Sequence, residues 1–361
     1  MSVTLRELRT RMAEAEIDGL LVSDETSADY LSGFSFSDGY LAILAEAAYL
    51  VTDFRYTEAA RAGANPAFEV VEAHGGTLLE ALDLLTRGGA RRVAFEEDAV
   101  TVSLLNRMQS LSEDRISFVG AASRWLSDLR LVKSEEELAR MAEAQRITDE
   151  AFSHILRQMT PRMTEREVAL ELEFFMRGKG AEGIAFDVIA VSGAASSRPH
   201  GVPRDVTLEG GFLTMDFGAK VDGYCADMTR TVVIGRADAE MKRLYQTVLT
   251  AQTEALCYLE GGGRGCREAD GVARAIIEGA GYHGCFGHSL GHGIGRAVHE
   301  APRLSPSVAE RERLVRGNVV SVEPGIYIEG KYGCRIEDMV AITDTGIRNF
   351  TKSKKELIEL F

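Results

Sequence analysis

The sequence lacks a long, uninterrupted hydrophobic segment. Its longest apolar stretch, residues 39–52, contains Glu46, whereas a helix that crosses a bilayer needs about 20 consecutive apolar residues. The amino-terminal residues read MSVTLRELRTRMAEAE and carry charges throughout, without the apolar core or the cleavage site of a secretory signal. We therefore expect no membrane span and a cytoplasmic location.

Cysteine is also scarce. The five cysteines are odd in number and no two lie closer than nine residues: Cys225, Cys257, Cys266, Cys285 and Cys334. This spacing matches neither a disulfide framework nor a CxxC motif for zinc or redox chemistry. We interpret the cysteines as buried or unreactive thiols.

Basic residues are fewer than acidic ones: the sequence has 41 Lys and Arg but 55 Asp and Glu, which gives a net charge of −14. Such a balance repels phosphate backbones and anionic lipids, and no basic cluster offsets it. The composition therefore argues against nucleic acid or a membrane surface as a partner. The length of 361 residues, 45% of them hydrophobic, indicates a folded protein of about two domains.

Short apolar runs alternate with helical stretches in the first third of the chain, which is typical of an α/β unit. After an amphipathic helix at 5–16, the apolar runs are 19–24, 41–53, 68–73, 92–97 and 116–120. A long charged helix is then predicted from Ser134, which stands in the capping-box position relative to Glu137. We therefore expect a smaller α/β domain over 1–128 and a second domain over 129–361.

The second domain contains two halves with the same predicted order, two helices followed by a pair of strands. The first half has helices at 134–159 and 164–179 and strands at 211–219 and 224–234, and the second has helices at 238–260 and 267–280 and strands at 318–328 and 332–343. This recurrence indicates an internal duplication.

Each predicted strand pair carries two acidic residues. In the first pair, a four-residue loop would place Asp216 opposite Asp227. In the second pair, a three-residue loop would place Glu323 opposite Glu337. Opposed carboxylates repel each other, so the arrangement requires a bound cation or a raised carboxyl pKa. Two such pairs at corresponding positions favour a metal site.

Between the strand pairs lies a glycine-rich segment, FGHSLGHGIGRAVHE, with His288, His292 and His299. The glycines disfavour a helix that would align the first two histidines. A glycine-rich loop lets the backbone approach a ligand closely, so that one imidazole could bind a metal while others contact substrate. His200, in another loop of small residues, is a candidate for the same site.

Four carboxylates and one imidazole form a hard ligand set, which favours Mn²⁺, with Co²⁺ or Zn²⁺ as alternatives. Two divalent ions would nearly balance the four carboxylates and a bridging hydroxide. Water bound to such ions has a pKa of about 7 and attacks carbonyls at neutral pH. We therefore predict two metal ions and hydrolysis by a metal-bridged hydroxide.

Four motifs resemble those of the dinuclear-metal "pita-bread" peptidases, which include methionine aminopeptidase, Xaa-Pro aminopeptidase (aminopeptidase P) and Xaa-Pro dipeptidase (prolidase). The motifs are MDFGAKVDGYCADMTRT, GHSLGHGIGRAVHE, SVEPGIY and RIEDMV. The resemblance covers residues 130–361 and implies an α+β pita-bread domain with an internal pseudo-two-fold repeat, in a homodimer. It places the metal ligands on Asp216, Asp227, His292, Glu323 and Glu337.

The first domain, including VTDFRYTEAA, resembles that of the proline-specific enzymes, whereas methionine aminopeptidases generally lack a domain of this size. Creatinase keeps the fold without the metal ligands, so the complete ligand set disfavours it. The resemblance therefore implies small peptide substrates with proline in the second position.

The resemblance also implies catalytic roles. Glu323 would accept the proton of the attacking water, and His299 would stabilise the oxyanion. His200 and His288 would line the proline side, where the leaving nitrogen must be protonated. Arg335 would order the neighbouring carboxylates.

Substrate length depends on recognition of the proline carboxylate, for which a bidentate arginine is well suited. Arg303 matches an arginine of some prolidases, and Arg55 of the first domain is a second candidate, from its own or a partner subunit. We favour dipeptide cleavage, with aminopeptidase P activity on longer peptides as the alternative. A non-catalytic binding protein on the same fold is a distant alternative that the complete ligand set disfavours.

Overall fold

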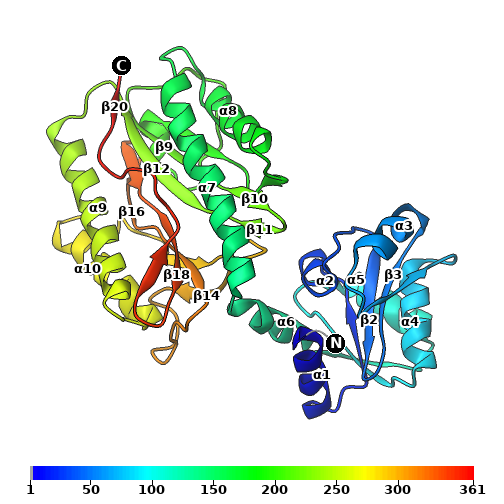
Figure 1. Ribbon diagram of the computed structural model, residues 1–361. Helices are drawn as coiled ribbons and strands as arrows, with labels where there is room; N and C mark the ends of the chain where they lie inside the picture. Colours follow the sequence, from blue (N-terminus) through cyan, green and yellow to red (C-terminus); the bar gives the residue numbers. More distant parts are fainter. Residues whose placement is uncertain (1–2) are drawn as a thin grey trace. The chain divides into compact units, whose positions relative to one another are not determined.

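The computed structural model describes residues 3–361, which divide after Arg130 into two compact units (Figure 1). None of the helices within residues 3–361 has both the length and the apolar character needed to cross a bilayer.

The N-terminal unit is built on one six-stranded sheet, whose strands follow the order β4-β3-β2-β1-β5-β6. The strands are β1 (Gly19–Val22), β2 (Gly39–Leu44), β3 (Ala48–Thr52), β4 (Glu69–Glu72), β5 (Arg92–Phe95) and β6 (Ser117–Gly120). The helices are α1 (Val3–Glu14), α2 (Glu25–Ser32), α3 (Phe54–Gly63), α4 (Thr77–Arg87), α5 (Val102–Ser112) and α6 (Ala122–Leu131). Separate hydrophobic clusters cover the two faces of the sheet, which confirms the predicted α/β character.

One apolar run of this unit was predicted as a single segment, residues 41–53, and forms two strands instead. The chain turns around Glu46, where the Leu44 N–H donates to the Ala47 carbonyl at 2.8 Å. β2 and β3 therefore pair antiparallel. The charge at Glu46 marks the turn because a buried strand interior would not accommodate it.

The C-terminal unit combines four long helices with several sheets. Its helices are α7 (Glu135–Gln158), α8 (Glu165–Gly178), α9 (Ala239–Glu260) and α10 (Cys266–Gly279), with a short 3₁₀ helix at Gly193–Ser197. The predicted capping box is confirmed, since Ser134 accepts from the Glu137 N–H and Glu137 accepts from the Ser134 N–H. In Figure 1 the α7 and α8 pair and the α9 and α10 pair flank the strands of this unit, and each pair packs on its own hydrophobic cluster.

Two larger sheets carry most of the strands, in the orders β20-β12-β9-β8 and β14-β13-β15-β18-β19. The first contains β8 (Ile189–Ser192), β9 (Gly211–Phe217), β12 (Met228–Ile234) and β20 (Glu359–Leu360). The second contains β13 (Gly291–Gly293), β14 (Glu300–Leu304), β15 (Val319–Val322), β18 (Asp338–Ile342) and β19 (Ile347–Asn349). Small sheets are formed by β7 (Gly183–Ile184), β10 (Ala219–Val221) and β11 (Tyr224–Cys225), and by β16 (Gly325–Ile328) and β17 (Tyr332–Arg335).

The predicted opposition of Asp216 and Asp227 is wrong. Asp216 pairs with Thr229 in the β9–β12 ladder. The hairpin closes through a two-residue turn at Asp222 and Gly223, with φ of 47° and 79°, rather than through four residues. Asp-Gly is the residue pair that such a turn favours, because both positions require positive φ.

The predicted register of the second strand pair is confirmed. Ile328 pairs with Tyr332 in the β16–β17 ladder, so the connecting loop has three residues. The β15–β18 ladder continues in the same register, with Val322 opposite Asp338. Glu323 and Glu337 lie in the gap between these two ladders.

All four predicted long strands are interrupted near the acidic residues. The first two break at Gly218 and at residues 226–227, and the second two break at residues 323–324 and 336–337. Gly218 is required at its break, because a Cβ there would lie 1.9 Å from the Ala226 carbonyl oxygen. Asp227, Glu323 and Glu337 lie at these interruptions, outside the strands, whereas Asp216 lies within β9, two residues before Gly218.

Candidate metal centre

Three buried side chains form the centre of a cluster in the C-terminal unit. Asp227, His292 and Glu337 each offer a ligand atom, and these atoms lie within 4.8 Å of one another. Asp227 directly precedes β12, Glu337 directly precedes β18, and His292 lies in β13. The cluster therefore joins strands from both of the larger sheets.

Two further carboxylates adjoin this cluster. The Glu323 Oε1 atom lies 3.2 Å from His292 Nε2, and Asp216 lines the same pocket together with the other four residues. The structure thus brings together all five residues that the sequence predicts as metal ligands. The pocket has a volume of about 440 Å³, and its lining also includes the apolar residues Phe186, Val188, Ile189, Val202 and Val298.

Two buried oxygens of the cluster have no hydrogen-bond partner among residues 3–361: Asp216 Oδ1 and Glu337 Oε1. An unpaired buried acceptor costs about 1–3 kcal/mol, and buried carboxylates are normally paired or bound to metal. Burial and the neighbouring Glu337 raise the pKa of Asp227 well above its usual range, and burial and Glu323 do the same to the pKa of Glu337. A divalent cation would satisfy both oxygens and favour the charged carboxylates, so this donor set fits a metal ion.

Glu323 differs from the other three carboxylates of the cluster because its pKa is lowered, whereas theirs are raised. Burial opposes its ionisation, but the hydrogen bond and charge of His292 outweigh burial and lower the pKa of Glu323 to about 2. The same contact, working against burial, raises the pKa of His292. Glu323 is therefore the carboxylate of the cluster that is most readily ionised.

Arg335 connects two of the carboxylates, as predicted from the resemblance. Its Nη2 donates to Asp216 Oδ2 at 2.6 Å, and its Nε donates to Thr229 Oγ1 at 2.9 Å. The Thr229 hydroxyl in turn donates to Glu337 Oε2 at 2.7 Å. The side chain of Arg335 is buried, with only 4% exposed. Its guanidinium orders Asp216 directly and Glu337 through the Thr229 hydroxyl.

Three residues of the site were not predicted from the sequence: Thr229, Ser321 and Tyr327. The Ser321 hydroxyl donates to Glu323 Oε1 at 3.1 Å and accepts from the His292 N–H at 3.0 Å. Thr229 in β12 and Ser321 in β15 each lie two residues from an acidic ligand candidate, Asp227 or Glu323, at the end of the strand. Because side chains alternate along a strand, this spacing was a usable signal. Tyr327 offered no such signal.

Tyr327 links Arg335 to His288. Its hydroxyl accepts from Arg335 Nη1 at 2.7 Å and lies 3.0 Å from His288 Nε2. His288 Nδ1 lies 2.8 Å from the Ser289 carbonyl, which can only accept. Burial lowers the pKa of His288, so the neutral ring donates through Nδ1 and accepts the Tyr327 proton through Nε2.

The other predicted substrate-contacting residues are distributed between the two units. His200, His299 and Arg303 line the pocket with the ligand candidates. The His299 ring lies 4.3 Å from the His292 ring, and Arg303 pairs with His292 across the β13–β14 ladder. Arg55 belongs to the N-terminal unit, where it pairs with Asp53 and Asp38.

Comparison with known proteins supports the same fold. Residues 139–344 match the model of Metallopeptidase family M24, and residues 5–132 match that of the Creatinase/Prolidase N-terminal domain. The chain is 43% identical over 358 residues to an uncharacterized peptidase of Bacillus subtilis, with 99% of each chain covered.

Two solved structures are similar over nearly the whole chain. An Xaa-Pro dipeptidase from Bacillus anthracis has a TM-score of 0.93 at 40% identity and 99% coverage of both chains. An X-Pro aminopeptidase from Thermotoga maritima has a TM-score of 0.88 at 37% identity, covering 97% of this chain and 100% of that chain. The predicted pita-bread fold and the predicted enzyme class, a metal-dependent peptidase, are confirmed. The chain belongs to metallopeptidase family M24, with a Creatinase/Prolidase N-terminal domain before its peptidase domain.

Proposed function

We propose that the protein hydrolyses the Xaa-Pro bond of dipeptides with two divalent metal ions, as a prolidase. The observation that carries the proposal is the buried cluster of carboxylates around His292, in which two oxygens lack a partner within residues 3–361. Two similar solved structures are an Xaa-Pro dipeptidase and an X-Pro aminopeptidase, and both support proline specificity.

The metal ligands in this proposal are five: Asp216, Asp227, His292, Glu323 and Glu337. Mn²⁺ is the expected ion, because a set of four carboxylates and one imidazole is hard. Divalent ions held by these residues supply Lewis-acid activation of water and of the peptide carbonyl.

The protein's own groups handle the protons. The carboxylate of Glu323, whose pKa is lowered by His292, is the group that accepts the proton of the attacking water. His299 donates a hydrogen bond to the carbonyl oxygen as negative charge develops there. His288 has both ring nitrogens engaged by Ser289 and Tyr327, so it shapes the wall of the pocket. His200 lies on a loop that lines the pocket. It is then the histidine placed beside the leaving proline nitrogen, which must be protonated.

Arg303 supports the preference for dipeptides. Its backbone is fixed opposite His292, and its side chain lines the same pocket as the cluster. In a dipeptide the proline carboxylate lies one residue from the cleaved bond, within the same pocket. A guanidinium binds that carboxylate through two charge-assisted hydrogen bonds. A longer peptide has an amide at this position and cannot form the same pair.

We expect Arg303→Ala to reduce kcat/KM for an Xaa-Pro dipeptide by about tenfold or more, since a hydrogen bond to a charged group contributes about 1.5–3 kcal/mol. The loss for an Xaa-Pro-Xaa tripeptide should be smaller. Steady-state kinetics with both substrates measure the two effects. Arg313→Ala is the control, because Arg313 pairs with Glu268 and is not a lining residue of the pocket. Equal losses on both peptides would contradict carboxylate recognition.

The proposed function is tested with metal-stripped protein that has been reloaded with Mn²⁺. The substrates are an Xaa-Pro dipeptide, an Xaa-Pro-Xaa tripeptide and an Xaa-Ala dipeptide as the control, and release of the first residue is measured. We expect metal-dependent cleavage of the Xaa-Pro dipeptide and no cleavage of Xaa-Ala. Preference for the tripeptide would assign the protein as an aminopeptidase P. Absence of cleavage with Mn²⁺, Co²⁺ and Zn²⁺ would favour a binding protein instead.

A further inference from the structure

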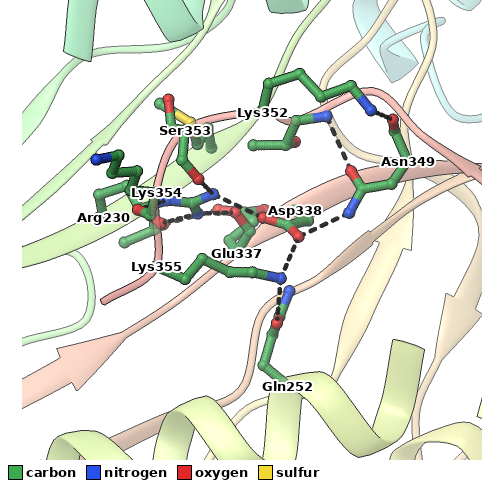
Figure 2. A network of polar contacts seen from close by, with 12 residues as sticks. Arg230, Gln252, Glu337, Asp338, Asn349, Lys352, Ser353, Lys354 and Lys355 are labelled. Atoms are coloured by element: carbon green, nitrogen blue, oxygen red, sulfur yellow. Dashed lines mark hydrogen bonds and ion pairs between the residues drawn. The ribbon is translucent and has the colours of Figure 1, made fainter. Parts of the chain in front are cut away.

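Arg230 is a buried arginine of β12, three residues after Asp227. It is not among the residues that line the pocket of the metal cluster. Only 1% of its side chain is exposed. A guanidinium has five N–H groups, and here there are five acceptors (Figure 2). They are Lys354 O at 3.0 Å, Thr229 O at 2.9 Å, Glu337 O at 2.6 Å, Asp338 Oδ1 at 2.8 Å and Ser353 O at 2.8 Å.

Asp338, the anionic partner of Arg230, is equally buried and fully engaged. It accepts from Arg230, from Lys355 Nζ at 2.8 Å and from Asn349 Nδ2 at 2.8 Å (Figure 2). A buried ion pair is weak evidence for stability, because desolvation of the two charges offsets their attraction. The number of directed contacts instead points to a role in fixing the geometry of the segments that Arg230 joins.

Two of those segments carry the metal cluster. The Glu337 N–H donates to the Thr229 carbonyl at 3.1 Å, and the Thr229 hydroxyl donates to Glu337 Oε2 at 2.7 Å. Arg230 Nη1 donates to the carbonyl oxygens of both residues. Glu337 lies in the gap between β17 and β18, so these contacts fix its backbone where the strand ladders do not.

The other side of Arg230 is supported by the segment 352–355. Asp149 of α7 accepts from the N–H groups of Lys352 at 3.0 Å and Ser353 at 2.8 Å. The Tyr245 hydroxyl of α9 donates to the Lys355 carbonyl at 3.0 Å. Helices from both halves of the domain therefore hold the segment whose Ser353 and Lys354 carbonyl oxygens accept from Arg230, and the guanidinium has little freedom to move.

We propose that Arg230 is a positioning residue for the metal centre: it anchors the backbone of Glu337 to the segment 352–355 and so aims the Glu337 carboxylate at the cluster. The inference rests on the proposed metal centre. It explains why one Glu337 oxygen is held by Thr229 while the other, Oε1, is buried without a partner among the described residues.

The test compares Arg230→Lys with Lys355→Met by titrating metal-stripped protein with Co²⁺ in a calorimeter and by recording the visible absorption of the bound Co²⁺. Lysine keeps the charge next to Asp338 but cannot form the planar set of five hydrogen bonds. We expect Co²⁺ affinity to fall by about 10–100-fold, the usual effect of losing a group that orients a metal ligand, and the absorption spectrum to change.

Lys355→Met is the matched control. Lys355 also contacts Asp338, and it contacts Gln252, but its Nζ bonds neither Thr229 nor Glu337. We expect this variant to lose thermal stability while its Co²⁺ affinity and spectrum stay unchanged. Circular dichroism confirms that each variant is folded at the titration temperature.

Wild-type Co²⁺ binding by Arg230→Lys would overturn the proposal, and so would equal weakening in both variants, because the effect would then be general destabilisation. If Arg230→Lys does not fold, Asp338→Asn replaces it, since asparagine retains an acceptor oxygen but removes the charge that anchors the guanidinium. Unchanged binding by folded Asp338→Asn would also overturn the proposal. Failure of the wild-type protein itself to bind Co²⁺ would reject the metal centre, which is a distinct outcome.

Discussion

We expect Asp227→Asn to abolish hydrolysis of Xaa-Pro peptides while the protein stays folded. Asp227 lies at the centre of the cluster with His292 and Glu337, and asparagine removes one of the four negative charges that would hold the metal ions. The loss should exceed the roughly 10–100-fold that results from removing a group that merely orients a ligand.

The fold should tolerate this substitution for an electrostatic reason. Burial and the neighbouring Glu337 raise the pKa of Asp227 well above its usual range in the metal-free protein. A raised pKa means that the neutral form is favoured there, and asparagine is a neutral side chain of nearly the same shape. The metal-free variant should therefore be at least as stable as the metal-free wild-type protein.

The measurements are the metal content after loading with Mn²⁺, the turnover of an Xaa-Pro dipeptide, and the circular dichroism spectrum. Asp222→Asn is a matched control, because Asp222 occupies the left-handed position of the hairpin turn, where asparagine is also favoured. This control should keep full activity. Turnover close to the wild-type value in Asp227→Asn would reject the assignment of the two-metal site.

The convergence of the acidic residues could be predicted even though one strand register was wrong. The turn at Asp222 and Gly223 is two residues shorter than expected, and this shifts the partner of Asp216 from Asp227 to Thr229. A shift by two residues keeps every side chain on the same face of the sheet, whereas a shift by one would have reversed them. Asp216 therefore still lines the same pocket as Asp227.

The contacts that hold the site together could not be predicted in this way. Hydrophobic periodicity reports the local conformation of a segment, but it does not report which distant segment lies beside it. Arg230 donates to the Ser353 carbonyl, and Thr229 donates to Glu337, each across more than 100 residues of sequence.

His299 should affect the rate much more than it affects metal binding. We expect His299→Ala to lower turnover by roughly 10²–10³-fold, the usual cost of removing one hydrogen-bond donor to an oxyanion. Burial and the neighbouring His292 lower the pKa of His299, so the ring is neutral at pH 7 and donates through an uncharged N–H. Its ring lies 4.3 Å from that of His292, beside the metal cluster.

The measurement separates the two roles that a histidine in this position can have. A metal ligand would lose bound Mn²⁺ on replacement, whereas an oxyanion donor would lose turnover with the metal content unchanged. His299→Gln retains an N–H donor on a side chain of similar length and should recover part of the rate. His154→Ala is the control, because His154 contacts Glu171 and is not a lining residue of the pocket. An unchanged rate in His299→Ala would remove this residue from the mechanism, and the developing charge on the carbonyl oxygen would then depend on the metal ions.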